Sequence, residues 1–460
     1  MNTTIAFDLD LIRKYDKAGP RYTSYPTAVQ FHEGFGEAQY RDMALQSNAS
    51  GRPLSLYFHI PFCDTVCFYC ACNRIITKNR RHTVPYLDHL HQEIALQGAL
   101  FDRERPVTQL HWGGGTPTFI STDEMRELMR VIGNHFQLLD DDQGEYSIEV
   151  DPRETNNGTI ALLRELGFNR LSLGVQDFNP QVQKAVNRIQ SREITLKTME
   201  AARHEGFKSI SVDLIYGLPL QTVTRFAHTV DDIIAQSPDR ISVFNYAHLP
   251  DLFKIQRQID ARALPSPSEK LEILKTVIEK LTHAGYVYIG MDHFAKPEDE
   301  LAQAQQIGTL YRNFQGYSTH AHCDLIGFGA TSIGMVGDSY SQNRKTLEDY
   351  YAQIAKEQLA IFRGVQLDAD DQLRRAVITT LICNFTLDFA TIERQYAIRF
   401  HDYFAAELDD LADMQADQLL ALDEHGIQVL PAGRLLIRNI CMVFDRYLRE
   451  QATQRFSRVI

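Results

Sequence analysis

Short β-rich runs alternate with longer helical patterns between about residues 50 and 290. Runs of β-branched and aromatic residues predict strands over 54–60, 107–112, 145–150, 170–175, 209–215, 240–247 and 286–291. Apolar residues at helical spacing predict helices between them, as over 84–100 and 268–285. This alternation indicates βα units and a parallel sheet. Six or seven such units favour an α/β fold built as a partial or complete (β/α) barrel, rather than a doubly wound sheet.

Unusual polar and glycine-rich segments directly follow six of these strands. Chemistry in barrels of parallel strands gathers at the C-terminal ends of the strands. We therefore expect one rim to carry the cysteine cluster at 63–72, GGGTP at 113–117, EVDPRE at 149–154, GVQDFNP at 174–180, DLIYGLP at 213–219 and NYAHLP at 245–250.

Four polar side chains stand out at or just past strand ends, namely Glu149, Gln176, Arg188 and Asp213. Each of them, taken singly, could equally be a surface residue or a helix cap. Their shared placement favours a function, because carboxylates suit hydroxyl groups and a guanidinium suits a carboxylate.

The pattern changes on either side of the predicted barrel. Residues 1–50 form an N-terminal extension, 51–364 the barrel domain, and 365–460 a mainly helical C-terminal domain. A short hairpin around His425–Gly426 followed by a helix makes the last domain winged-helix-like. Because acidic residues outnumber basic ones there, we expect a packing or lid domain rather than a DNA-binding one.

Charge and hydropathy exclude several classes of function. The formal net charge of −12 argues against nucleic-acid binding, which needs a basic surface. The first 20 residues carry early acids and no apolar signal-peptide core, and no run of about 18 apolar residues could span a membrane. The sequence thus predicts a cytoplasmic protein, and nothing in it demands a second subunit, so we expect a monomer.

Four of the seven cysteines lie within ten residues, in CDTVCFYCAC at 63–72. A disulfide framework is disfavoured by the odd number of cysteines and by the expected reducing compartment. A structural zinc site usually takes its ligands from two separated pairs, so one short loop would be cramped. An iron–sulfur cluster suits the loop best, although zinc and redox thiols stay open. The scattered Cys323, Cys383 and Cys441 are expected to be buried packing residues.

A cluster held by only three thiolates would leave one iron without a protein ligand. If Cys63, Cys67 and Cys70 hold three irons of a 4Fe–4S cube, the fourth iron is free to bind a small chelating molecule. An open position marks a catalytic rather than a structural metal site. Cys72 is then a spare thiol beside the cluster.

The segment CDTVCFYC resembles the C-x3-C-x-aromatic-C signature of the radical S-adenosylmethionine (SAM) superfamily, with Tyr69 as the aromatic residue. The resemblance implies that the open iron chelates SAM. It also implies that an electron from the reduced cluster cleaves SAM to methionine and a 5′-deoxyadenosyl radical, which removes hydrogen from carbon. The glycines of HWGGGTPT resemble the superfamily motif that binds the SAM amino group, with Gly-Thr-Pro here where many members have a glutamate.

Further motifs, in order along nearly the whole chain, resemble the family of oxygen-independent coproporphyrinogen III oxidases. They are GPRYTSYPTA, LYFHIPFC, HWGGGTPT, EVDPRE, GVQDFNPQVQKAVNR, DLIYGLPLQT, VFNYAHLP, GMDHFA, NFQGYST and the terminal FSRVI. The resemblance implies conversion of two propionate groups of coproporphyrinogen III to vinyl groups in haem biosynthesis. It also implies a low-potential electron donor such as flavodoxin or ferredoxin.

The family resemblance implies two SAM molecules and assigns residues to them. Tyr57, Gly114 and Glu149 resemble contacts to the cluster-bound SAM, while the contacts to the second are carried over to Tyr69, Gly115, Thr116, Gln176, Arg188, Asp213, Ala247 and Ile333. Phe314 and Gln315, with Tyr57, are expected to face the reacting groups.

The expected substrate carries four carboxylates although the chain is acidic, so a local basic lining is required. Arg21 and Arg312 are the candidates, and a surface salt bridge is the alternative for both. A related branch of the superfamily binds haem as a chaperone without catalysis. The segments PRYTSYPTA and NFQGY, together with Cys72, favour the oxidase.

Overall fold

A computed structural model describes residues 5–450, which form two compact units of discontinuous sequence. The sheet unit consists of residues 31–276 and 322–366, and the helical unit consists of residues 5–30, 277–321 and 367–450. Helix α9, Pro267–His283, carries the chain from the first to the second. The boundaries expected from the sequence near residues 50 and 365 stay predictions.

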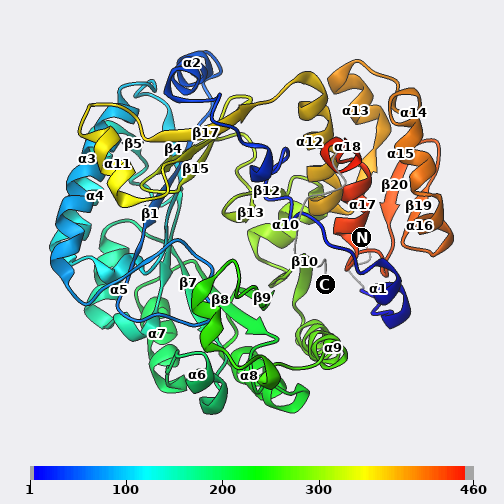
Figure 1. Cartoon of the computed structure of the whole chain (residues 1–460), viewed down its shortest axis with the longest axis horizontal. Helices are drawn as coiled ribbons and strands as arrows, with labels where there is room; N and C mark the ends of the chain where they lie inside the picture. The colour runs from blue at the N-terminus through cyan, green and yellow to red at the C-terminus, as the bar shows by residue number, and fades with distance from the viewer. Residues whose placement is uncertain (1–4, 451–460) are drawn as a thin grey trace. The chain divides into compact units, whose positions relative to one another are not determined.

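Parallel strands dominate the sheet unit (Figure 1). Six of them follow the predicted order, namely β1 Leu54–Ile60, β4 Pro106–Gly114, β6 Glu145–Val150, β7 Arg170–Gln176, β8 Ser209–Tyr216 and β9 Arg240–Asn245. Within this unit the strand order is β9-β8-β7-β6-β4-β1-β14-β15-β16-β17, and the short β5, Gln137–Leu138, pairs with β4. No pairing joins β9 to β17 in the described residues, so the sheet is open and the partial form of the predicted barrel is confirmed.

An alternation of burial separates the two faces of the central strands. In β6, β7 and β8 the apolar residues at every second position are buried, among them Ile148, Leu173 and Val212. The residues between them, such as Glu149 and Asp213, are partly accessible. Because successive side chains point to opposite faces, this register turns one face to the helices and leaves polar groups on the other. β1 is buried on both faces, as its nearly continuous apolar sequence predicts.

Helices of the sheet unit lie along the outer side of its parallel strands (Figure 1). They include α3 Thr83–Gly98, α4 Thr122–His135, α5 Asn157–Glu165, α6 Pro180–Ala185, α7 Arg192–His204 and α8 Val223–Gln236, with α2 Glu37–Asn48 and α11 Leu347–Ile354 elsewhere in the unit. Polar caps start six of them, where the capping side chain accepts a hydrogen bond from the backbone N–H three residues later, namely Ser121, Asn156, Asn179, Ser191, Thr222 and Thr346. Six short 3-10 turns link elements of the chain: Ala28–Gln30, Arg80–His82, Pro117–Phe119, Pro152–Glu154, Lys254–Gln258 and Ala261–Ala263.

The last part of the sheet unit was not expected from the sequence. β14, Asp324–Phe328, lies parallel to β1, and β15 Ile333–Val336, β16 Ser339–Asn343 and β17 Ile361–Gln366 continue in antiparallel order. The predicted strand over 286–291 forms as β10, Val287–Gly290, in the helical unit, but its expected parallel pairing is wrong. Gly290 and Met291 adopt positive φ values and turn the chain back, so β10 pairs antiparallel with β11, His293–Ala295.

The helical unit joins segments from three parts of the sequence. Its helices are α1 Leu9–Tyr15, α10 Glu300–Ile307, α12 Ala369–Asn384, α13 Phe389–Tyr396, α14 Phe400–Tyr403, α15 Ala405–Asp410, α16 Ala412–Ala416, α17 Ile437–Val443 and α18 Arg446–Glu450. A hairpin pairs β12, Tyr311–Asn313, with β13, Gly316–Ser318. β18 Thr386–Asp388, β19 Leu420–Leu422 and β20 Gly426–Val429 form a small antiparallel sheet. The hairpin predicted around His425–Gly426 is confirmed.

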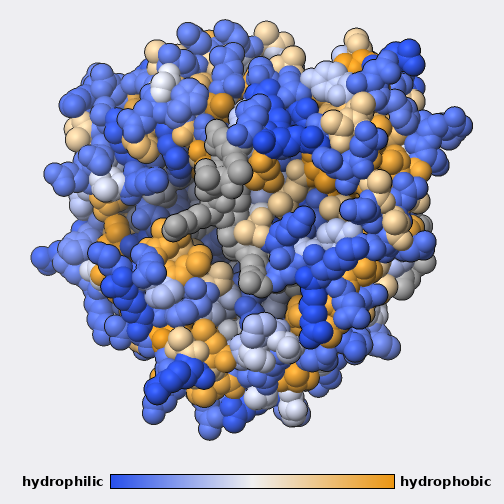
Figure 2. Space-filling model, turned by 45° about the vertical axis from the view of Figure 1, so that its right-hand side comes forward, coloured by the Kyte–Doolittle hydropathy of each residue, from blue (hydrophilic) through white to orange (hydrophobic). Residues whose placement is uncertain are grey.

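No helix within residues 5–450 combines the length and apolarity needed to cross a membrane. On the face shown in Figure 2, hydrophilic residues predominate and hydrophobic residues form small separate patches. Scattered apolar residues of this kind are normal on a protein surface.

Candidate active site

The cysteine loop leaves the sheet unit directly after β1. Cys63 ends β2, Phe62–Cys63, which pairs in parallel with β3, Ile75–Ile76. Two contacts tie the middle of the loop to the segment after α6: Asn187 Nδ2 donates to Val66 O at 2.8 Å, and Phe68 N donates to Val186 O at 2.9 Å. The loop that carries the cysteines is thus fixed at both ends and in its middle.

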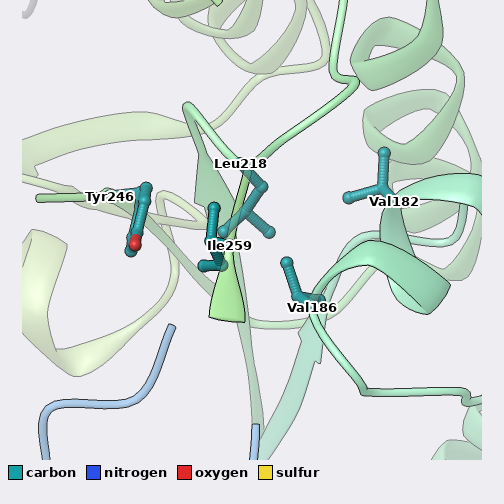
Figure 3. Close-up of a cluster of buried hydrophobic side chains, with 5 residues drawn as sticks. All are labelled: Val182, Val186, Leu218, Tyr246 and Ile259. Carbon is teal, nitrogen blue, oxygen red and sulfur yellow. The ribbon is translucent and has the colours of Figure 1, made fainter. Parts of the chain in front are cut away.

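An apolar cluster packs against the cysteine loop, and Figure 3 shows its five buried members. Its buried members come from α6 and from the segments after α6, β8 and β9, and they are Val182, Val186, Leu218, Tyr246 and Ile259. Phe68 and Tyr69 of the cysteine loop pack against this cluster. Gln256 Nε2 also donates to Tyr69 O at 3.2 Å. Packing and hydrogen bonds therefore hold the aromatic residue of the cysteine motif in place.

A cavity of about 310 Å³ opens above the ends of the central strands. All four clustered cysteines line it, together with residues of four of the predicted rim segments. Of the residues expected to contact SAM, the lining includes Tyr69, Gly114, Gly115, Thr116, Glu149, Gln176, Arg188 and Asp213. Side chains that are more than 150 residues apart in sequence thus meet at one site.

The glycine turn after β4 brings backbone close to the cysteine loop. A Cβ atom on Gly115 would lie 2.7 Å from Phe62 O and from Pro61 C, and one on Gly114 would lie 2.5 Å from His59 Nδ1. Gly114 also has a φ of +112°, which side chains rarely allow. The N–H groups of Gly115 and Thr116 donate to Ile60 O and Phe62 O, each at 2.8 Å. Only glycine permits this approach.

A hydrogen-bonded network orients Glu149 at the base of the cavity. Gly114 N donates to Glu149 Oε2 at 3.0 Å, and His111 Nε2 lies 3.5 Å from Glu149 Oε1. His111 also bonds Ser147 Oγ through Nδ1 at 2.6 Å and stacks on Tyr57 with ring centroids 5.8 Å apart. Desolvation raises the pKa of Glu149, but His111 and the Gly114 N–H outweigh it and keep the pKa below its usual value. The carboxylate is therefore ionised and fixed.

Tyr57 is placed beside the cysteine loop by His59. The Tyr57 hydroxyl lies 3.1 Å from His59 Nδ1, and His59 Nε2 lies 3.1 Å from Asn73 O. Burial lowers the pKa of His59, so its imidazole stays neutral. Tyr57 itself is not among the residues that line the cavity.

Arg188 is buried among partners next to Cys67. Its Nη1 donates to Asp151 Oδ2 at 3.0 Å and lies 3.6 Å from Cys67 Sγ, while Nη2 donates to Gly174 O at 2.6 Å. Arg153 pairs with the same Asp151 oxygen at 2.7 Å and reaches within 3.9 Å of Cys67 Sγ. Two guanidinium groups thus provide positive charge beside one thiol, with a carboxylate holding both.

The other thiols differ in their surroundings. Burial raises the pKa of Cys63 to about 11, although the hydroxyl of Thr116 lies 3.5 Å from its sulfur. A hydrogen bond from Cys72, aided by Arg74 and Arg188 and opposed by burial, lowers the pKa of Cys70 to about 6. The cavity therefore favours the thiolate of Cys70, which is the form that binds a metal.

Gln176 and Asp213 present further polar atoms to the cavity. Gln176 has a positive φ of 68° at the end of β7, and its buried Oε1 has no hydrogen-bond partner among the described residues. Desolvation and then the charge of Glu149 raise the pKa of Asp213 to about 6, despite a hydrogen bond from Ser172 Oγ at 3.2 Å. An acceptor without a donor and a partly neutral carboxyl group both suit a hydroxyl-bearing ligand.

The remaining predicted residues lie elsewhere. Ala247 is exposed after β9, and Ile333 begins β15, but neither is among the cavity-lining residues. Phe314 and Gln315 belong to the β12–β13 hairpin of the helical unit, so their expected role stays a prediction. Sequence reasoning missed Asp151 as the partner of Arg188, and Arg153 as a second guanidinium paired with Asp151, although both stand in the quoted EVDPRE segment.

Comparison with known proteins identifies relatives over the full length of the chain. The model of the radical SAM superfamily matches residues 57–233, and the model of the HemN C-terminal domain matches residues 367–436. The oxygen-independent coproporphyrinogen III oxidase of Pseudomonas aeruginosa is 57% identical over 100% of both chains. The protein of the same name from Escherichia coli is 52% identical over 99% of both. This chain belongs to the oxygen-independent coproporphyrinogen III oxidase family.

The fold of this family member agrees with a solved relative. The structure described as coproporphyrinogen III oxidase (HemN) from Escherichia coli, a radical SAM enzyme, superposes with a TM-score of 0.92 at 50% identity. It covers 96% of this chain and 100% of the relative. The radical SAM fold predicted from the cysteine motif and the strand pattern is confirmed.

Membership of the radical SAM superfamily implies a 4Fe–4S cluster and SAM, and the residues present fit both. In the described residues, no three of His, Cys, Asp and Glu converge as ligands of a single metal ion. A cluster makes a different demand, because each thiolate binds its own iron. Cys63, Cys67 and Cys70 line one cavity, and the guanidinium groups beside Cys67 suit the negative charge of a thiolate-bound cluster. The unpartnered Gln176 Oε1 and the glycine turn suit a polar ligand next to it.

Proposed function

We propose that this chain converts two propionate side chains of coproporphyrinogen III to vinyl groups, giving protoporphyrinogen IX. The observation that carries the proposal is the 57% identity over the whole chain to a relative named for this activity. The cysteine cavity supplies the second support, because it combines three thiols with polar groups suited to SAM.

The atoms and electrons of the reaction balance with one SAM for each propionate. Each –CH2–CH2–COO⁻ group loses one hydrogen atom from its β-carbon, one CO2 and one electron, and becomes –CH=CH2. When bound, the cluster and SAM together supply the radical that takes the hydrogen atom. The remaining electron passes to an external one-electron acceptor. The propionate β C–H is not acidic enough for a protein base, so hydrogen-atom removal is the step that needs this machinery.

The residues of the chain position the reactants rather than react themselves. Cys63, Cys67 and Cys70 would hold the cluster. Glu149, held by His111 and the Gly114 N–H, would accept hydrogen bonds from the SAM molecule that binds the cluster. Arg188, fixed by Asp151, would pair with a carboxylate. Tyr57, with Phe314 and Gln315 of the β12–β13 hairpin, would contact the reacting groups.

Two SAM molecules per chain form part of the proposal. One would lie at the glycine turn near Glu149, and the other near Gln176, Arg188 and Asp213, with Ala247 and Ile333 as family-derived contacts. Equilibrium dialysis of reconstituted protein with radiolabelled SAM should give two bound molecules per chain, and Gln176→Ala should reduce this to one at unchanged iron content. One molecule per chain in both proteins would refute the second site.

The donor of the electron would be a low-potential carrier such as flavodoxin or ferredoxin, with the chain acting as a monomer in the cytoplasm. Lys78 and Arg81, on the exposed segment after the cysteine loop, have no acidic partner in residues 5–450. A basic segment on a chain of net charge −12 suits docking of an acidic carrier.

An anaerobic assay tests the function directly. Reconstituted protein, a reductant, SAM and coproporphyrinogen III should yield protoporphyrinogen IX, which is oxidised and measured by its fluorescence. Cys67→Ala serves as the control without a cluster. Tight haem binding without any vinyl product would instead indicate the chaperone activity of the related branch.

A further inference from the structure

Arg312 is a buried arginine without an acidic partner. It lies on β12 and is 6% exposed, and its Nε and Nη1 atoms are buried without a hydrogen-bond partner in the structure of residues 5–450. No ion pair to Arg312 occurs within the same residues. A buried guanidinium is costly unless hydrogen bonds and a counter-charge compensate it. Residues 5–450 supply neither a hydrogen bond to these two atoms nor a counter-charge.

The β12–β13 hairpin nevertheless holds this side chain in one orientation. Arg312 is opposite Tyr317 in the antiparallel register, and its guanidinium lies 4.6 Å from the centroid of the Tyr317 ring. The Tyr317 hydroxyl donates to Ile382 O at 3.2 Å. The same hydroxyl lies 2.3 Å from the place of a Cβ on Gly290, so a larger residue would displace it. The guanidinium is stacked on one face while its donor edge stays unpaired.

Positive charge accumulates around this edge in the helical unit. Arg21 pairs with Asp292 at 2.9 Å, and Arg438 donates to the backbone oxygens of Gly19 and Pro20. Burial first, and then the charge of Arg21 with a smaller contribution from Arg312, lower the pKa of Arg438 to about 10, although Asp292 opposes the shift. Arg21 and Arg312 thus both act on Arg438, and Asp292 is the acid paired with Arg21.

Gln315 adds a second unpaired donor on the same hairpin. Its backbone N–H donates to Asn313 Oδ1 at 2.9 Å, which fixes the turn, while its side-chain Nε2 is buried without a hydrogen-bond partner in the described residues. Guanidinium and amide N–H groups are both donors that a carboxylate accepts, and Arg312 and Gln315 offer them from one short hairpin.

We propose that Arg312, with Gln315, binds a carboxylate of the substrate. This inference rests on the proposed function, because it assigns one propionate group of a tetracarboxylate ring to the helical unit. The bidentate edge supplies orientation as well as charge, which a lysine could not reproduce. The energetic reason is that the carboxylate brings the counter-charge that Arg312 does not find in the described part of the chain.

Equilibrium binding tests the site without turnover. Coproporphyrin III, the fluorescent oxidised ring with the same four propionates, is titrated into cluster-loaded protein and compared with its tetramethyl ester. We expect Arg312→Gln to weaken binding of the tetraacid at least tenfold, with little effect on the ester. Arg312→Lys keeps the charge but not the bidentate edge and should lose several-fold. Arg394→Gln, at an exposed arginine of the same unit, is the control and should bind normally.

Thermal melting of each variant separates binding from folding. Weakened binding at an unchanged melting temperature, in Arg312→Gln or in Arg312→Lys, supports the site. Wild-type affinity of both variants for the tetraacid, or equal losses for acid and ester, overturns it. The proposed function can fail separately. A wild-type protein that makes no vinyl product, yet binds the tetraacid through Arg312, would leave the carboxylate site standing.

Discussion

The cysteine rim of the sheet unit and the β12–β13 hairpin of the helical unit each bury an arginine, in different company. Arg188 is 7% exposed and donates hydrogen bonds to Asp151 Oδ2 and Gly174 O, and its guanidinium also lies next to Cys67 Sγ. Arg312 is 6% exposed and stacks on Tyr317, with two nitrogens lacking any partner in the described residues. The two arginines are therefore buried to the same degree, but only Arg188 has a counter-charge in the described residues.

The difference separates two uses of a buried charge. Asp151 compensates Arg188, so this guanidinium is part of the folded framework and keeps positive charge next to Cys67, a proposed cluster ligand. Arg312 has no such counter-charge in the described residues, so the fold does not explain why an arginine is buried there. A protein commonly gives up some stability where a site must remain ready for its ligand. The comparison predicts that the two arginines respond in opposite ways to the same substitution.

The largest expected effect comes from the thiol that Arg188 contacts. Cys67→Ala should lose the cluster and all turnover, because the two remaining thiolates cannot hold a cube. Cys72→Ala should keep near-normal iron, since Cys72 is the spare thiol. Iron and sulfide per chain, with visible absorbance, measure this in anaerobically reconstituted protein. Full iron content in Cys67→Ala would show that Cys67 is not one of the thiolates that hold the cluster.

The comparison itself is sharpened by replacing each arginine with methionine. Arg188→Met removes one of the two guanidinium groups that pair with the buried Asp151 carboxylate, so the free energy of unfolding should fall. Because Arg153 still pairs with Asp151, the decrease should be at most about 3 kcal/mol. Arg312→Met removes a charge without partners and should leave stability unchanged or raise it. Urea denaturation of both variants at one pH gives the values. Equal destabilisation by the two substitutions would contradict the distinction.

A smaller, pH-dependent effect is expected at Asp213. Its pKa of about 6 in the folded chain exceeds the ~3.9 of an unfolded aspartate, so the unfolded state releases its proton first as pH rises. This carboxyl group therefore lowers the free energy of unfolding progressively between about pH 4 and 6, and the loss is complete above that range. Asp213→Asn should remove this slope, so its stability relative to wild type should rise from pH 4 to 7. Parallel slopes for both proteins in denaturant titrations would show that Asp213 is not so perturbed.

The smallest effect should come from Thr116, whose hydroxyl lies 3.5 Å from Cys63 Sγ. Hydrogen bonds to ligand sulfurs raise the reduction potential of a cluster. Thr116→Val should therefore keep full iron content and shift the cluster potential slightly to more negative values. Redox titration followed by electron paramagnetic resonance measures the shift, with Thr118→Val as the neighbouring control. An equal change of the cluster potential in Thr116→Val and Thr118→Val would show that the Thr116 hydroxyl has no specific effect on it.

Local patterns sufficed for the framework of the sheet unit. Runs of β-branched and aromatic residues placed six parallel strands, while the cluster with an open iron on Cys63, Cys67 and Cys70 stays a prediction from their spacing. The antiparallel strands β14–β17 were missed, because no β-rich run with a following helix marks them. The expected parallel pairing of residues 286–291 was wrong because two positive-φ residues turn the chain there.

The sequence by itself determined which residue types stand at strand ends and how the cysteines are spaced, since both are properties of neighbouring residues. Only the tertiary structure decided which of these groups share a cavity and which have partners. Asp151 compensates Arg188, whereas Ala247 and Ile333 are absent from the cavity lining and Arg312 is left without an acid in residues 5–450. The physical reason is that charge compensation depends on sheet register and on packing between segments far apart in the chain, and no local pattern carries that information.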